Sequence, residues 1–170
     1  MEPNFESLIV FAEIGIAYVA FSTIVAALQP IRGKPFTRFQ VLLVHFYIES
    51  GSLNVGMALL PLVLWNFFHD ELMVWRVSIW ALLIMTTTYL ITYAFRRRRV
   101  RAPTPLPSLL VMVGYGIVNI VMIITLTEIF WLPSMAIYSA YLLWGLFGSA
   151  VIFIYFFGSF IRRSAGRLRG

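Results

Sequence analysis

Long apolar segments alternate with short polar ones along the whole chain. A helix of about 20 apolar residues is long enough to cross the hydrocarbon of a bilayer, and each apolar segment reaches that length. We therefore predict an all-α, polytopic membrane protein with five transmembrane helices. The predicted spans cover residues 5–29, 37–68, 72–95, 108–130 and 134–161.

The second predicted span differs from the others in its length and polarity. It is longer than a bilayer requires and contains Pro61, so we expect it to tilt, to kink at the proline, or to extend beyond the hydrocarbon. Its middle holds the small and polar stretch from Glu49 to Gly56. We predict that this helix is the central one of the bundle.

The basic residues predict the direction of the helices. All of them except Arg76 lie in three short stretches between or after the spans: Arg32, Lys34 and Arg38; Arg96, Arg97, Arg98, Arg99 and Arg101; Arg162, Arg163, Arg167 and Arg169. Short loops rich in Lys and Arg stay on the cytoplasmic side during insertion, so we predict the N-terminus outside and the C-terminus inside. Trp65, Trp75 and Trp131 then mark the outer interface, where indole rings are favoured.

Composition leads to the same class of protein. The chain of 170 residues is 61% hydrophobic and 12% charged, against about 25% charged for a soluble domain. One integral membrane domain covering residues 1–170 is expected. The net charge of +6 lies in loops that flank the membrane, so we assign it to contact with anionic lipids and not to nucleic acid. The absence of cysteine excludes disulfides and thiolate ligands.

The start of the chain adds an expectation about location. Residues 12–20 resemble segments of bacterial membrane proteins, which implies the bacterial inner (plasma) membrane. The resemblance implies no particular site. The acidic N-terminal residues do not fit a signal peptide, so we expect the first span to remain in the mature protein.

Three ionisable side chains lie well inside the predicted spans, at the depth of the hydrocarbon, and are candidates for function. These residues are Glu13, His45 and Glu49. A charged side chain at the centre of a bilayer costs roughly 2.5–3.5 kcal/mol on insertion scales, so such groups usually face protein or water. Helical spacing places His45, Glu49, Ser52 and Gly56 on one face of the second helix. Tyr47, Ser50 and Asn54 lie on nearly the opposite face.

Three interpretations of His45 and Glu49 remain open. They form a buried hydrogen-bonded pair that holds the bundle together, they belong to a proton or cation path, or they ligate a metal. The metal interpretation lacks the remaining ligands of a tetrahedral site. No cofactor is expected.

The other polar residues have structural alternatives. Glu13 shares a face with Ala17, Ala20 and Ala27, which we expect to allow close helix approach; the carboxylate either locks the first helix by a hydrogen bond or lines a pore. We expect Asn119 to connect helices, and Gly145, Gly148 and Ser149 to form a close-packing surface. Arg76 is predicted to pair with Glu71 or Asp70.

The sequence favours a small membrane transport protein over an enzyme. We expect a homo-oligomeric ion or proton channel with a path formed by Glu13, His45, Glu49, Ser52, Asn54 and Asn119. A membrane anchor or assembly subunit, in which the buried polar groups are structural, is the alternative. An integral membrane metalloenzyme using His45 and Glu49 is the third interpretation. It is the least favoured of the three, because no nucleophile or full ligand set is apparent.

Overall fold

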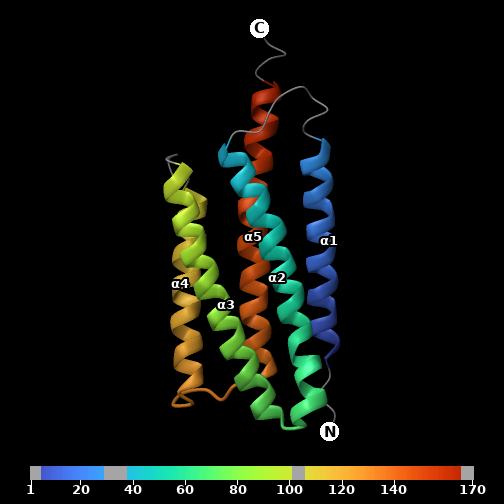
Figure 1. The fold of residues 1–170 in the computed structure, drawn as a ribbon, viewed down its shortest axis with the longest axis vertical. Helices are drawn as coiled ribbons and strands as arrows, with labels where there is room; N and C mark the ends of the chain where they lie inside the picture. Colours follow the sequence, from blue (N-terminus) through green and yellow to red (C-terminus); the bar gives the residue numbers. More distant parts are fainter. Residues whose placement is uncertain (1–4, 29–37, 101–105, 166–170) are drawn as a thin grey trace.

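The protein is a bundle of five long α-helices in which neighbours along the chain run in opposite directions. The computed structural model describes residues 5–28, 38–100 and 106–165. The helices are α1 (Glu6–Leu28), α2 (Arg38–Phe68), α3 (Glu71–Val100), α4 (Leu106–Leu126) and α5 (Met135–Ala165). Figure 1 shows the chain passing up and down along the long axis, with the start of α1 and the end of α5 at opposite ends of the bundle. The all-α prediction is confirmed.

The helix boundaries agree closely with the apolar segments, with two informative differences. α3 continues through the arginine run to Val100, because arginine is a good helix former even where the apolar segment has ended. α4 stops at Leu126, short of the predicted residue 130. Glu128 there has a φ of 57°, a left-handed conformation that ends a helix. α2 remains one continuous helix through Pro61.

Packing among the helices makes α5 as central as α2. α2 contacts α1, α3 and α5, whereas α5 contacts all four of the other helices. α4 packs on α3 and α5. Within the described part of the chain, the backbones of α2 and α4 do not approach each other, so side chains must fill the space between these two helices.

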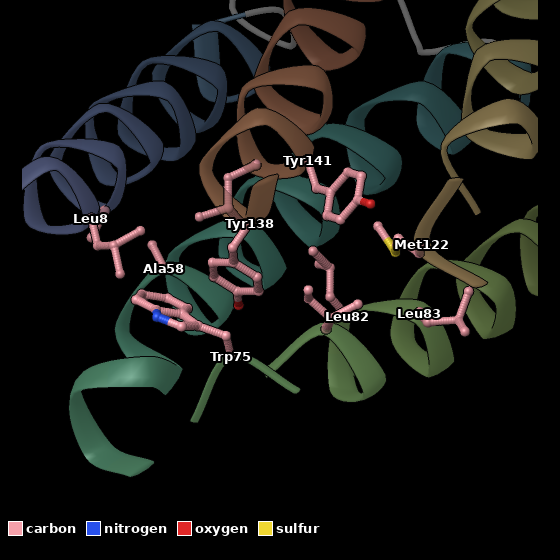
Figure 2. Packing of buried hydrophobic residues seen from close by; sticks show 11 residues of the cluster. Leu8, Ala58, Trp75, Leu82, Leu83, Met122, Tyr138 and Tyr141 are labelled. Carbon is pink, nitrogen blue, oxygen red and sulfur yellow. The ribbon is translucent and has the colours of Figure 1, made fainter. Parts of the chain in front are cut away.

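The main core cluster draws side chains from every helix. Figure 2 shows Leu8 of α1 and Ala58 of α2 on the side of Trp75 of α3 and Tyr138 of α5, and Met122 of α4 beside Tyr141 of α5. Trp75 is only 1% exposed and packs its ring against that of Tyr138, at a centroid distance of 5.8 Å. Its expected role as an interfacial aromatic is therefore wrong. Its indole lies at the right level along the helix but points into the bundle.

Glycine contacts set the close packing of α1 on α2. A Cβ atom added at Gly51 would lie 2.5 Å from Cγ2 of Val19, and one added at Gly15 would lie 2.7 Å from Cγ2 of Val55. Only a residue without a side chain leaves room for this approach. The prediction that Ala17, Ala20 and Ala27 form the contact is wrong, because all three are exposed on the bundle surface.

The outer surface is that of a membrane-integral protein. Four helices are long and apolar enough to cross a membrane, and α5 contributes a shorter apolar stretch over Met135–Val151. Large apolar side chains such as Ile84, Ile117 and Phe147 are more than half exposed, which is stable in lipid but not in water. We call the end of the bundle that carries Arg96, Arg97, Arg98 and Arg99 the basic end, and the other the loop end.

Candidate functional site

The six residues predicted to form one polar path are separated by the fold. Glu13 is exposed on the face of α1 that points away from α2. The described part of the structure gives its carboxylate no hydrogen bond or ion pair. Asn54 is buried inside the bundle, and Asn119 is half-buried between α3 and α4. The path therefore does not form within one chain.

The two polar faces of α2 have opposite environments. Tyr47, Ser50 and Asn54 are buried, at 2%, 5% and 8% exposure. His45 and Ser52 are exposed on the other face, which Gly56 continues. The prediction of two polar faces is confirmed, but only the face with Asn54 is covered by neighbouring helices.

Glu49 has a different partner from the one considered from sequence. Nη1 of Arg96 donates to both carboxylate oxygens of Glu49 at 2.8 Å, connecting α2 to α3. Both side chains are about two-fifths exposed, at 38% for Glu49 and 44% for Arg96. A buried pair of His45 with Glu49 is therefore wrong. The carboxylate is neutralised by a guanidinium in a charge-assisted contact.

The same contact bears on the metal interpretation. Both oxygens of Glu49 are occupied by Arg96, and His45 is exposed. Within residues 5–28, 38–100 and 106–165, no three metal-ligating side chains come together. These positions do not fit a metal centre, and we do not carry that interpretation further.

Asn119 connects α3 to α4, as expected from sequence. Its Oδ1 accepts a hydrogen bond from Oγ1 of Thr86 at 2.8 Å, and its Nδ2 donates to Oγ1 of Thr87 at 3.2 Å. The amide oxygen and the amide nitrogen thus each make one hydrogen bond to α3 within the same chain. This arrangement is structural and leaves Asn119 outside the exposed face of α2.

Arg76 pairs across helices rather than along its own helix. Its Nε donates to Oε1 of Glu128 at 2.9 Å, and its Nη2 contacts the same oxygen. The predicted partners Asp70 and Glu71 have other roles: Asp70 Oδ1 accepts from the Leu72 amide, and Glu71 accepts from Trp75 Nε1. The ion pair therefore fastens α3 to the turn after α4 at the loop end.

The remaining basic residues divide between described and undescribed parts of the chain. Arg98 and Arg99 are exposed, whereas Arg97 is 9% exposed and differs from the expected headgroup position. Arg32, Lys34 and Arg101 lie outside the described residues, as do the side chains of Arg38, Arg162 and Arg163.

Tyrosine hydroxyl groups form connections between helices that the sequence analysis did not identify. Tyr18 donates to the Ser149 carbonyl at 2.9 Å, Tyr89 to that of Phe46 at 3.0 Å, and Tyr138 to that of Met57 at 2.7 Å. A helical carbonyl keeps a second lone pair that can accept such a bond. In the sequence, these hydrogen bonds between helices are indicated only by the position of the tyrosines in the middle of apolar segments.

A cavity lies between α2, α3, α4 and α5, where the backbones of α2 and α4 stay apart. Its volume is about 40 Å³, measured as the space open to the centres of water molecules. Its lining includes Ser50 and Asn54 of α2, Thr86 of α3, Ser108 of α4 and Gly145 of α5, with aromatic and aliphatic side chains between them. None of the residues that line it carries a formal charge.

The close-packing surface predicted on α5 is confirmed and lies within the subunit. A Cβ atom at Gly148 would lie 3.0 Å from Val111 of α4, and one at Gly145 would lie 2.7 Å from Oδ1 of Asn54. Ser149 is buried and its hydroxyl lies 3.2 Å from that of Ser50. These contacts bring α5 against both α2 and α4.

No protein family, curated protein or solved structure matches this chain at a significant level. The arrangement of its side chains is therefore the basis for the function proposed below.

Proposed function

We propose that the protein is a small membrane transport protein that works as a homo-oligomer, with an ion or proton path between subunits along the exposed face of α2. The observation that supports this is the direction of that face. His45 and Ser52 point away from the bundle in one subunit, beside the half-exposed Glu49. Polar groups on a membrane helix normally face protein or a water-filled cavity.

A second copy of the chain is the simplest cover for this face. In a closed symmetric assembly, each subunit presents the same surface to its neighbour, so one polar face per subunit would suffice to line a shared path. Ser52 and Gly56 are small enough to let such helices approach. Glu13 and the exposed alanines of α1 lie on a different surface and are not part of the proposed path.

The side chains along the face favour protons over other cations. Arg96 neutralises Glu49 through both carboxylate oxygens, and the nearby basic residues would repel metal cations. Imidazole is the side chain that proteins most often use to pass protons, and His45 places one on this face. Toward the loop end the face becomes apolar, at Leu59 and Val63, where a constriction between subunits would limit leakage.

Proton flux tests this proposal directly. In proteoliposomes with a trapped pH-sensitive dye, we expect the wild-type protein to dissipate a pH gradient and His45→Asn to slow that flux at least several-fold. His69→Asn is the matched control, since His69 lies in the exposed loop between α2 and α3. Asparagine also tolerates the positive φ of 50° at that position. Wild-type protein without flux in either orientation would exclude the channel.

The alternative function is a membrane anchor or assembly subunit, and the same exposed face supports it. In that case a different membrane protein, rather than a second copy, would cover His45 and Ser52. Two further proposals hold for either function. The protein lies in the bacterial inner membrane, and its basic end faces the cytoplasm and contacts anionic lipids. The arginines at that end support the orientation.

Single cysteines distinguish the two functions, because the chain has none of its own. For a homo-oligomer, we expect Ser52→Cys to form a disulfide-linked dimer in membranes under mild oxidation. Ile117→Cys is the control, since Ile117 is exposed at 58% on α4, a helix whose backbone does not contact that of α2. If both variants formed dimers to the same extent, the dimers would indicate random collision in the membrane. If neither variant formed dimers, the result would favour the anchor.

A further inference from the structure

We infer that the cavity between α2, α3, α4 and α5 is a binding site for a slender, uncharged, lipophilic molecule that carries a hydroxyl or carbonyl group, and that Asn54 recognises this group. The site lies inside each subunit, on the side of α2 opposite the proposed path. The inference is therefore independent of the transport function. The shape, the chemistry and one unpaired amide support it.

The cavity is long and narrow. Its lining on α3 extends from Leu82 to Tyr93, which at 1.5 Å per residue corresponds to about 16 Å along the helix axis. A volume of about 40 Å³ for the centres of water molecules is spread over this length. Such a space suits a linear chain or a thin molecule and excludes a bulky one.

The lining predicts the polarity of the ligand. Most of the lining residues are aromatic or aliphatic, among them Phe46, Met85, Tyr89, Met112 and Tyr115, and such apolar walls are typical of sites for lipophilic molecules. Because no lining side chain is charged, a carboxylate or an ammonium group would lose its hydration without gaining a partner. The ligand is therefore uncharged.

Most polar side chains in the lining are already satisfied by the protein. The Tyr89 hydroxyl donates to a carbonyl of α2, the Ser50 hydroxyl bonds within α2 and lies against Ser149, and Thr86 bonds Asn119. Tyr115 donates weakly to the Gly145 carbonyl, at 3.4 Å. These hydroxyls do not need a ligand.

Asn54 has no such partner. Its side chain is 8% exposed, lines the cavity and makes no hydrogen bond with another described residue. Its amide is not among the fully enclosed polar atoms that lack a partner, so it opens onto the cavity and can bind a polar group there. An amide offers both a donor and an acceptor, and a hydroxyl or carbonyl group on the ligand complements it.

Gly145 makes the space that this recognition needs. Oδ1 of Asn54 would lie only 2.7 Å from a Cβ atom at position 145, and Nδ2 would lie 3.0 Å from it. Glycine therefore lets the amide lie flat against α5 beside the cavity. Ser108, at 2% exposure, provides a second hydroxyl in the lining, in the first turn of α4.

Thermal unfolding in nanodiscs with a series of straight-chain alcohols tests the inference. We expect the alcohols to raise the melting temperature, with an optimum at a chain length that fills the cavity and a decline for longer chains. Alkanes of equal length should stabilise less, because they leave Asn54 unpaired. In Asn54→Leu, the difference between alcohol and alkane should disappear.

Asn66→Leu is the matched control, because Asn66 is an exposed asparagine of the same helix and bonds only to the Leu62 carbonyl of its own turn. It should keep the preference for alcohols. Asn54→Leu is expected to fold without ligand, since it removes an unpaired amide from an apolar site. Three results would overturn the inference: stabilisation that rises with chain length without an optimum, equal effects of alcohols and alkanes on the wild type, or no effect of either, as for a cavity holding only water.

A photoreactive alcohol locates the site independently of stability. A straight-chain alcohol with a diazirine on its chain should label peptides of α2 and α5 that include Asn54 and Gly145. Excess unlabelled alcohol should compete for this labelling. Labelling confined to the lipid-facing surface of α1, around Val10 and Ile14, would show partition into the bilayer and contradict the site.

Discussion

Replacing Trp75 with alanine is expected to destabilise the bundle by about 3–5 kcal/mol, the range measured for large aromatic residues truncated in closely packed cores. The ring is 1% exposed and lies between Phe5, the residue before α1, and Tyr138 of α5. Its Nε1 also donates to Glu71 at 3.3 Å. Truncation would leave an empty space in the core cluster that all five helices share. Unfolding in mixed micelles at increasing denaturing detergent measures the change.

Trp80→Ala on the same helix is the control for this experiment. Trp80 is 50% exposed on the outer surface, where lipid or detergent fills the space that the ring leaves. We expect the loss of stability to be no more than a quarter of that for Trp75→Ala. Similar losses for the two variants would mean that Trp75 is not packed in the core as described.

Substituting Gly51 by alanine is expected to cost about 1–3 kcal/mol, as overpacking of a filled contact usually does. The added Cβ would lie 2.5 Å from Cγ2 of Val19 and 3.2 Å from Cδ1 of Tyr18. Valine has one strongly preferred rotamer in a helix, so it cannot turn aside without strain. α1 must then move away from α2, which weakens the most extensive helix contact of the bundle.

Gly56→Ala provides the comparison on the same helix. A Cβ at position 56 meets no atom within 4 Å, so the change adds only the better helix propensity of alanine, up to about 1 kcal/mol. The two variants should therefore change the free energy of unfolding in opposite directions. If Gly56→Ala destabilised the purified protein strongly, the exposed face of α2 would be a contact between copies.

The polar residues of α2 support two separate roles on its two sides. His45 and Ser52 face outward, where assembly would have to cover them. Asn54 faces inward, toward the cavity. A single mutation on either side should leave the readout of the other side unchanged, which makes the two proposals separable in one set of variants.

Some tertiary contacts were within reach of sequence reasoning. Asn119 was expected to connect helices and does so through Thr86 and Thr87. The small residues Gly145 and Gly148 were expected to allow close packing and contact α2 and α4. In both cases the residue type carries the information, because an amide in an apolar helix needs a partner and a glycine leaves room for one.

The sequence did not predict which residues form the ion pairs. Arg76 has two acidic residues within six positions on its own helix or at its start, yet it pairs with Glu128. Glu49 has His45 one turn away, yet it binds Arg96. Both actual partners come from another helix, and their distance depends on how far each helix is shifted along its neighbour. Local spacing carries no information about that shift.

The sequence by itself determined the number of helices, their approximate bounds and the membrane class of the protein, because these depend on the length of apolar runs and on the prolines and charges between them. The tertiary structure decided which side of each helix faces inward. In a water-soluble helix the polar face marks the solvent, but lipid and protein interior are both apolar, so the pattern does not orient the helix. For that reason Gly15 and Asn54 could be assigned to the interior, and Ala17 and Ser52 to the outer surface, only once the helices were packed.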